Sequence, residues 1–136
     1  MNIRRADRAD HEAILALWQG AELSRPWIDG AAELELKVAT DPDGLLVAIV
    51  DDRVVGTVMV GFEGHRGWIN YLAVDADQRR AGIGRRLMAA AEDRLRELGA
   101  PKVNLQVRTS NAQVVAFYEA LGYVHDDVVS LGRRLD

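Results

Sequence analysis

The stretch Arg79-Arg80-Ala81-Gly82-Ile83-Gly84 decides the fold of this chain. It follows a strand-like apolar run over residues 68–74 and opens an apolar-periodic helix over residues 84–98. The two glycines let the backbone turn tightly and approach a ligand closely. The first N–H groups of a helix have no partner inside the helix and mark its positive end. The sequence therefore predicts a phosphate-binding loop between a strand and a helix.

The spacing excludes two better-known phosphate loops. A P-loop needs a lysine after its last glycine, and none follows Gly84. A dinucleotide-binding loop needs a third glycine at the position of Leu87. The pattern that remains is Arg or Gln, two residues, Gly, one residue, then Gly or Ala, which resembles the pyrophosphate loop of the GNAT acetyltransferases.

The resemblance continues on both sides of the loop. Tyr71-Leu72-Ala73-Val74-Asp75 precedes it, and Asn111, Phe117-Tyr118-Glu119 and Leu121-Gly122-Tyr123 follow it in order. This succession is similar to the second half of a GNAT domain and covers about half of the chain. It implies an α/β fold in which a mixed, mostly antiparallel sheet splays between its fourth and fifth strands, with about four flanking helices.

Length, composition and charge set further limits. With 136 residues the chain is expected to form one domain over 1–136. The absence of cysteine excludes disulfides and a cysteine nucleophile. The longest apolar run, 45–50, is far below the ~20 residues of a membrane span. We therefore expect a soluble cytoplasmic protein without a membrane partner, and the net charge of -4 gives no support to nucleic-acid binding.

Periodicity and breakers predict the order of elements. A helix capped by Asp7 or Asp10 precedes a break at Ser24–Trp27, and a final helix capped by Ser110 or Asn111 ends at Gly122. The other expected segments are strands at 3–5, 45–50, 53–60, 68–74 and 102–107, a helix at 31–38, a turn at 61–67, and closing strands at 123–129 and 130–135.

The resemblance also implies which residues hold acetyl-coenzyme A. The pantetheine arm enters the gap in the sheet, and its pyrophosphate lies on the glycine loop. The implied coenzyme contacts are Leu72, Ala73, Val74, Arg79, Arg80, Ala81, Gly82, Ile83, Gly84, Arg85, Asn111 and Tyr118. From the sequence, Asn111 is equally a helix cap, and a solvated helix face explains Arg86 as well as a phosphate contact does.

The resemblance implies which residue protonates the departing thiolate, but the group that takes a proton from the amine stays open. Tyr118 stands where the family has the tyrosine beside the coenzyme sulfur, so the resemblance implies that it protonates the thiolate. Asn70 stands where many relatives carry a glutamate that acts as the base, and Gln106 stands where relatives that modify ribosomal-protein N-termini carry one. An amide accepts no proton at neutral pH. The remaining candidate bases are His65, Glu63, Glu33 and Asp126.

The expected function is an N-acetyltransferase acting on an amine. Arg25, Trp27, Asn70 and Gln106 are the expected substrate contacts, and no metal is expected. The chain is also similar to small bacterial proteins of the YpeA type. Two alternatives stay open, a protein N-terminal acetyltransferase and a module that senses acyl-coenzyme A without turnover. The resemblance also allows a homodimer.

Overall fold

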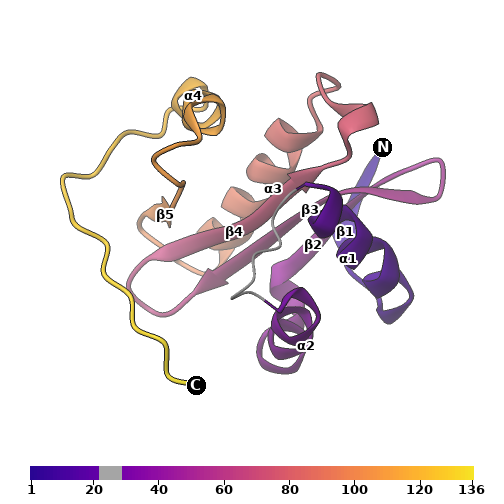
Figure 1. Ribbon diagram of the computed structural model, residues 1–136, viewed down its shortest axis with the longest axis horizontal. Coiled ribbons are helices and arrows are strands. Elements are labelled where there is room, and N and C mark those ends of the chain that lie inside the picture. Colours follow the sequence, from indigo (N-terminus) through magenta and orange to yellow (C-terminus); the bar gives the residue numbers. More distant parts are fainter. Residues whose placement is uncertain (22–28) are drawn as a thin grey trace. The chain divides into compact units, whose positions relative to one another are not determined.

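The computed structural model describes residues 1–21 and 29–136. The chain divides into two compact units, 1–106 and 107–136, each with its own internal contacts. Figure 1 shows the elements of each unit. The expectation of one domain over the whole chain stays a prediction.

Unit 1 is built on a five-stranded mixed sheet. Its strands lie in the order of the sequence, with the first four antiparallel and the fifth parallel to the fourth. They are β1 Asn2–Arg5, β2 Leu45–Val50, β3 Arg53–Phe62, β4 Gly67–Val74 and β5 Val103–Leu105. The β2–β3 hairpin turns through Asp51 and Asp52, whose φ angles of 51° and 61° match the tight turns that suit twisted strands. The predicted GNAT-like fold class is confirmed.

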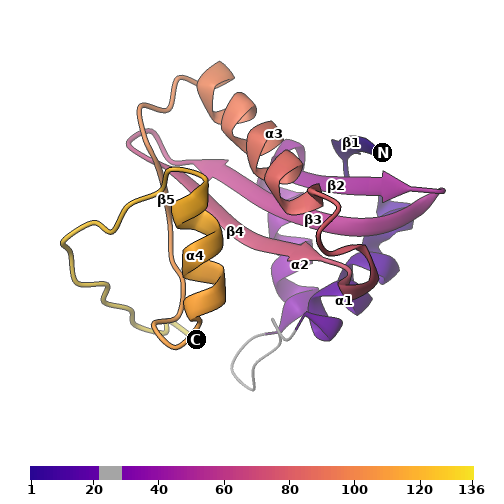
Figure 2. The same cartoon turned by 90° about the horizontal axis from the view of Figure 1, so that it is seen from above.

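Four α-helices are described, three of them in unit 1. They are α1 His11–Gly20, α2 Gly30–Thr40, α3 Ile83–Glu97 and, in unit 2, α4 Ala112–Ala120. The Asp29 side chain caps α2 by accepting from the Ala32 N–H at 3.1 Å. Figure 2 shows α3 on one face of the sheet and α1 with α2 on the other.

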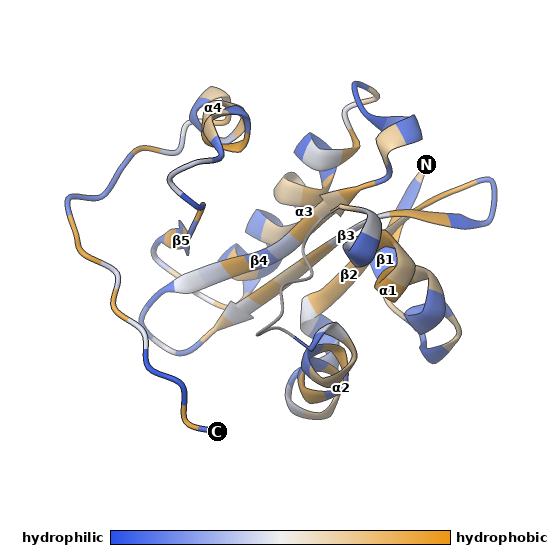
Figure 3. Cartoon of the chain, in the orientation of Figure 1, coloured by the Kyte–Doolittle hydropathy of each residue, from blue (hydrophilic) through white to orange (hydrophobic). Residues whose placement is uncertain are grey.

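Apolar side chains fill both faces of this sheet, and the hydrophobic colour follows β2 and β3 in Figure 3. On the α1 and α2 side, the buried cluster consists of Ile14, Trp18, Leu34, Leu45, Val47 and Ala73. On the other side α3 packs directly on the start of β4, because a Cβ added at Gly67 would lie 2.6 Å from Leu95. Helices therefore pack on both faces of β4.

A bulge interrupts β4 near its end. Thr57 pairs with Ala73 and Met59 with Asn70, so Tyr71 and Leu72 together oppose the single residue between the two β3 positions. A bulge of this kind bends its strand. The pairing of β4 with β5 ends at Ile69, so the following part of β4 has no β5 partner among the described residues. This is the splay that the resemblance implies.

The predicted boundaries need two corrections. Strand 102–107 shortens to Val103–Leu105, because the bent β4 leaves the parallel ladder after three pairs. The closing strands at 123–129 and 130–135 are wrong, since no strand forms in unit 2. Their apolar side chains are 77 to 96% exposed at Val124, Val128, Val129, Leu131 and Leu135. A segment with strand-forming residues becomes a strand only where it finds a partner strand and an apolar surface to cover.

Candidate active site

The glycine loop links β4 to α3 through left-handed backbone. Asp75 caps a short turn by accepting from the Asp77 N–H at 3.0 Å. Arg80 and Gly82 then adopt φ angles of 72° and 77°, and Gly82 is the residue that caps α3. A Cβ added at Gly82 would meet no atom within 4 Å, so open space lies over the backbone at this point. Glycine is required here by conformation, not by crowding within the protein.

The charges around this loop suit an anion. Arg79, Arg80, Arg85 and Arg86 are exposed, and none forms an ion pair with a carboxylate of the described residues. The first bond within α3 runs from the Arg86 N–H to the Gly82 carbonyl at 3.1 Å. The N–H groups before it belong to the free first turn of the helix. Helix end and arginines together fit a pyrophosphate.

The bulge holds Tyr71 in a conformation that bulky residues rarely adopt. Its φ angle is 53°, and strain of this kind costs about 1–3 kcal/mol. Its ring stacks on Trp18 of α1, with centroids 3.9 Å apart and planes 23° from parallel. The Trp18 indole N–H donates to the Thr57 hydroxyl at 2.9 Å, and that hydroxyl donates to the Tyr71 carbonyl at 2.9 Å. Two neighbouring elements therefore fix the backbone of the bulge.

The Tyr71 hydroxyl is buried and has no hydrogen-bond partner of acceptable geometry among the described residues. Burial raises the pKa of Tyr71 far above its ordinary value, and the nearby Glu33 carboxylate raises this pKa further. This phenol therefore stays protonated at neutral pH. Glu33, an open candidate for the base, comes close to the bulge through this side chain.

Asn70 of β4 and Gln106, the residue just after β5, lie where the parallel ladder between these strands ends. Ile69 and Leu105 form the last pair of the β4–β5 ladder, and Asn70 and Gln106 follow them. Asn70 pairs with Met59, whose side chain packs on the α1 and α2 side of the sheet, so the exposed Asn70 side chain faces that side too. Asn70 therefore lies where the sheet opens, and Gln106 is the first residue after β5.

Glu63 and His65 lie at the opposite end of β4. Both are exposed in the turn between β3 and β4. The Glu63 carboxylate accepts from the N–H groups of His65, at 2.7 Å, and of Arg66, and these bonds lower its pKa. Five residues separate Gly67 from Leu72, which is roughly 15 Å of strand. That Glu63 or His65 is the base stays a prediction, and their distance from Leu72 weakens it.

Unit 2 contains the expected proton donor. Tyr118 is 8% exposed on α4, and its ring meets those of Phe117 and Tyr123 edge to face, with centroids 5.1 and 5.7 Å away. Burial raises its pKa to about 12. Asn111 caps α4, since its side-chain oxygen accepts from the Val114 N–H at 3.4 Å. The cap is therefore present, and the roles of both residues toward the coenzyme stay predictions.

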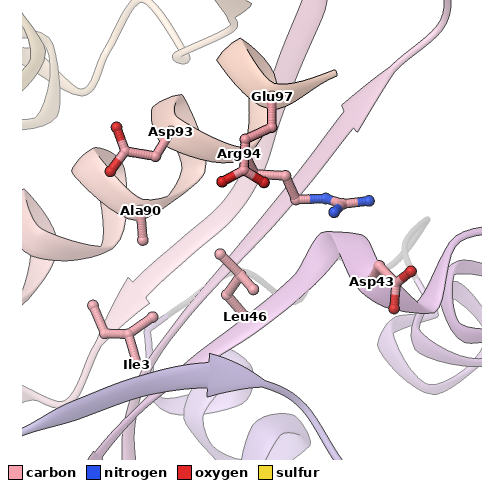
Figure 4. A pocket seen from close by; sticks show the side chains of 7 residues that line it. All are labelled: Ile3, Asp43, Leu46, Ala90, Asp93, Arg94 and Glu97. Atoms are coloured by element: carbon pink, nitrogen blue, oxygen red, sulfur yellow. The ribbon is translucent and has the colours of Figure 1, made fainter.

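Other parts of the chain add little to this site. Arg25, Pro26 and Trp27 lie outside the described residues. Within the described residues, no group of three His, Asp or Glu side chains could hold a metal, and no helix is long and apolar enough to cross a membrane. A pocket of about 320 Å³ lies between α3 and the first two strands, as Figure 4 shows, away from loop and bulge. It is lined by Ile3, Asp43, Leu46, Ala90, Asp93, Arg94 and Glu97.

The structure adds the Trp18, Thr57 and Tyr71 cluster, which sequence reasoning missed as a site feature. Trp18 follows the apolar stripe of α1 and is indistinguishable by pattern from an ordinary core residue. Thr57 is a common strand residue. Because the side chain of Tyr71 favours extended backbone, nothing in the sequence indicates its left-handed φ.

Comparison with known proteins agrees with this geometry. The profile of the "Acetyltransferase (GNAT) family" matches residues 11–123. "Acetyltransferase ECA0875" of Pectobacterium atrosepticum is 43% identical over 135 residues, which is 99% of this chain and 96% of that protein. Among solved structures, Ard1 from Thermoplasma volcanium has a TM-score of 0.81 at 29% identity, covering 90% of this chain and 82% of Ard1. A ribosomal-protein-alanine N-acetyltransferase from Brucella melitensis has a TM-score of 0.73 at 27% identity, covering 90% and 83%.

The profile spans the splayed strands, the glycine loop and α4, and the first relative matches over nearly its whole length. The chain therefore belongs to the acetyltransferase (GNAT) family, whose members use acetyl-coenzyme A.

Proposed function

We propose that this protein is an N-acetyltransferase that binds acetyl-coenzyme A and an amine in a ternary complex and transfers the acetyl group to the amine, releasing coenzyme A. The observation that carries the proposal is the succession of bulge, opened strand and glycine loop along one stretch of chain. The loop offers a helix end and arginines without an ion-pair partner among the described residues. The opened strand offers, on the edge away from β3, backbone groups that β5 does not pair. A thioester and a pyrophosphate need these two kinds of contact.

In this proposal, the residues of the loop bind the pyrophosphate of the coenzyme, and the residues of the strand orient its thioester. Arg79, Arg80 and Arg85, with the backbone from Ala81 to Gly84, hold the pyrophosphate. The backbone of Leu72, Ala73 and Val74 holds the pantetheine and polarises the thioester carbonyl. Acetyl-coenzyme A supplies the activated acetyl group. Asn111 adds a coenzyme contact, and the Tyr118 hydroxyl donates the proton that the departing sulfur needs.

The amine must lose a proton, and no carboxylate stands at the two usual positions. Asn70 and Gln106 can hold a water molecule by accepting and donating hydrogen bonds. We propose that deprotonation goes to solvent through such water, or follows the low pKa of the acceptor itself. Glu33 is the alternative base, supported by its approach to Tyr71.

Two other functions remain as alternatives. A protein N-terminal acetyltransferase is favoured by the likeness to the Brucella melitensis protein, and disfavoured by an amide at Gln106. A module that senses acyl-coenzyme A is favoured by both amides, and disfavoured by the buried phenol of Tyr118. We further propose a YpeA-type protein that works in the cytoplasm, as a homodimer or alone, without nucleic acid, membrane or metal.

Turnover separates these functions. Purified protein receives acetyl-coenzyme A and a panel of small amines, amino acids and N-terminal peptides, and thiol release is recorded. Release that depends on small amines supports the proposal, and release with peptides alone supports the N-terminal acetyltransferase. Saturable binding of acetyl-coenzyme A without release for any acceptor would contradict an enzyme and indicate the sensing module. Longer acyl-coenzymes in the same assay define the preferred acyl group.

A further inference from the structure

The peptide between Tyr71 and Leu72 has a direction that the structure determines. The Tyr71 carbonyl accepts from the Thr57 hydroxyl of β3 at 2.9 Å. In a trans peptide the C=O and the following N–H point in opposite directions, and no cis peptide bond is described. The Leu72 N–H therefore points away from the Thr57 hydroxyl. The ladder between β4 and β5 has already ended at Ile69, three positions earlier.

The Thr57 hydroxyl is held in this orientation from α1. Thr57 is fully buried, and its oxygen accepts from the Trp18 indole N–H at 2.9 Å. Because a hydroxyl has one hydrogen, accepting from Trp18 leaves that hydrogen for the Tyr71 carbonyl. The stacking of Trp18 on Tyr71 fixes the same residue a second time. The bulge therefore depends on one directed hydrogen-bond chain from helix to strand.

We infer that Thr57 and Trp18 are positioning residues for acetyl transfer: they hold the left-handed Tyr71 backbone and thereby aim the Leu72 N–H into the gap in the sheet. The inference rests on the proposed function, in which backbone groups from Leu72 onward polarise the thioester. A donor aimed in advance at a developing oxyanion lowers the barrier without reorganisation. A misplacement of about 1 Å costs on the order of 10²-fold in rate.

The test replaces the hydroxyl while keeping the volume. We expect Thr57→Val to lower kcat by about ten- to a hundredfold and to change the KM for acetyl-coenzyme A by about twofold at most, because the pyrophosphate contacts stay intact. Thr57→Ser keeps the hydroxyl and should restore kcat to within about threefold of the wild type. Trp18→Phe keeps a stacked ring but loses the N–H, so its loss of kcat should be smaller than that of Thr57→Val.

A matched control separates positioning from stability. Val60 is buried on β3, and its pairing with Ile69 places it on the face that α3 covers. Val60→Ala should lower the Tm without the selective loss of kcat. Wild-type kcat in Thr57→Val, or an equal loss in Thr57→Ser, would overturn the inference.

A second measurement needs no turnover. The backbone amide signal of Leu72 in a ¹⁵N-labelled sample is followed while acetyl-coenzyme A is added. We expect this signal to shift in the wild type and in Thr57→Ser, but much less in Thr57→Val at saturation. Equal shifts in all three proteins would overturn the inference. A wild type that binds and never turns over contradicts the proposed function, while this amide signal still tests the positioning.

Discussion

The turns at the two ends of β4 each contain a glycine with positive φ but differ in design. At its start, the turn before Gly67 contains Glu63, Gly64, His65 and Arg66, and the Glu63 carboxylate accepts from two of its N–H groups. At its end, the loop around Gly82 has left-handed backbone, exposed arginines and a helix N-terminus. The first turn satisfies its own donors. In the second, the N–H groups of Arg79 and Ala81 bond within the loop, while those that open α3 have no acceptor among the described residues.

This difference teaches how to distinguish a structural glycine turn from a binding loop. Both Gly64 and Gly82 have positive φ, at 100° and 77°, and an added Cβ would meet nothing within 4 Å at either. Neither conformation nor space separates them. The two positions differ in whether the neighbouring N–H groups have acceptors. In the turn at Gly64, the Glu63 carboxylate accepts from the N–H groups of His65 and Arg66.

The largest effect is expected when the proton donor for the sulfur is lost. If the end of β4 carries the thioester, the departing thiolate needs an acid, and Tyr118 is the proposed one. Tyr118→Phe should lower kcat by about 10² to 10⁴ and leave coenzyme affinity nearly intact. Steady-state kinetics and calorimetry check this pair of values. Wild-type turnover in the variant would show that Tyr118 only packs against Phe117 and Tyr123.

The same residue makes a prediction about pH. Burial raises the pKa of Tyr118 to about 12, so its acidic form is present at every pH below that value and is lost only above it. No decline of kcat attributable to Tyr118 should appear between about pH 6 and 10. A falling limb in this range that disappears in Tyr118→Phe would contradict the buried, protonated phenol.

A smaller effect is expected from the charges at the two ends. Replacing both Arg79 and Arg80 by alanine should weaken coenzyme A binding by about tenfold, or ~1.4 kcal/mol. The loss should shrink at high salt, because exposed charges are screened. Arg66→Ala, at the start of β4, is the matched control and should stay within about twofold. Equal losses for the two variants would mean that binding depends only on overall charge.

The smallest effect is expected at His65. With deprotonation through water, kcat/KM should rise with pH along the titration of the acceptor amine, and its midpoint should move when acceptors of different pKa are used. His65→Gln should leave this profile unchanged. An inflection that stays at one pH for all acceptors and disappears in His65→Gln would make His65 the base and contradict the assignment of its turn as structural.

The sequence predicted the fold well because its signals are local. Two glycines after a strand, the hairpin around Asp51 and Asp52, and the caps of the helices each act within a few residues. The closing strands failed for the opposite reason. The valines and leucines of residues 123–135 suggested strands, but a strand is stable only with a partner, and pairing depends on contacts far along the chain.

The site was predictable in part, and the limit lies in the backbone. The loop from Arg79 to Gly84 carries its chemistry in residue types, so the pattern revealed it. The bulge has no such pattern of residue types. The φ angle of Tyr71 is stabilised by contacts with Thr57 and Trp18, which are 14 and 53 positions away. His65 and Glu63 remained candidates from the sequence because their side chains can accept a proton, and residue type alone does not show that the chemistry lies at the other end of β4.

Calorimetric titration of coenzyme A into the wild type, Gly82→Glu and Gly64→Glu tests the central claim most directly. Both variants place the same charged side chain on a left-handed glycine with open space, one at each end of β4. We expect Gly82→Glu to lose well over tenfold in affinity, more than ~1.4 kcal/mol, while Gly64→Glu stays within about twofold and both remain folded. Unchanged affinity in Gly82→Glu, or an equal loss in Gly64→Glu, would contradict the assignment of the loop at Gly82 as the coenzyme site.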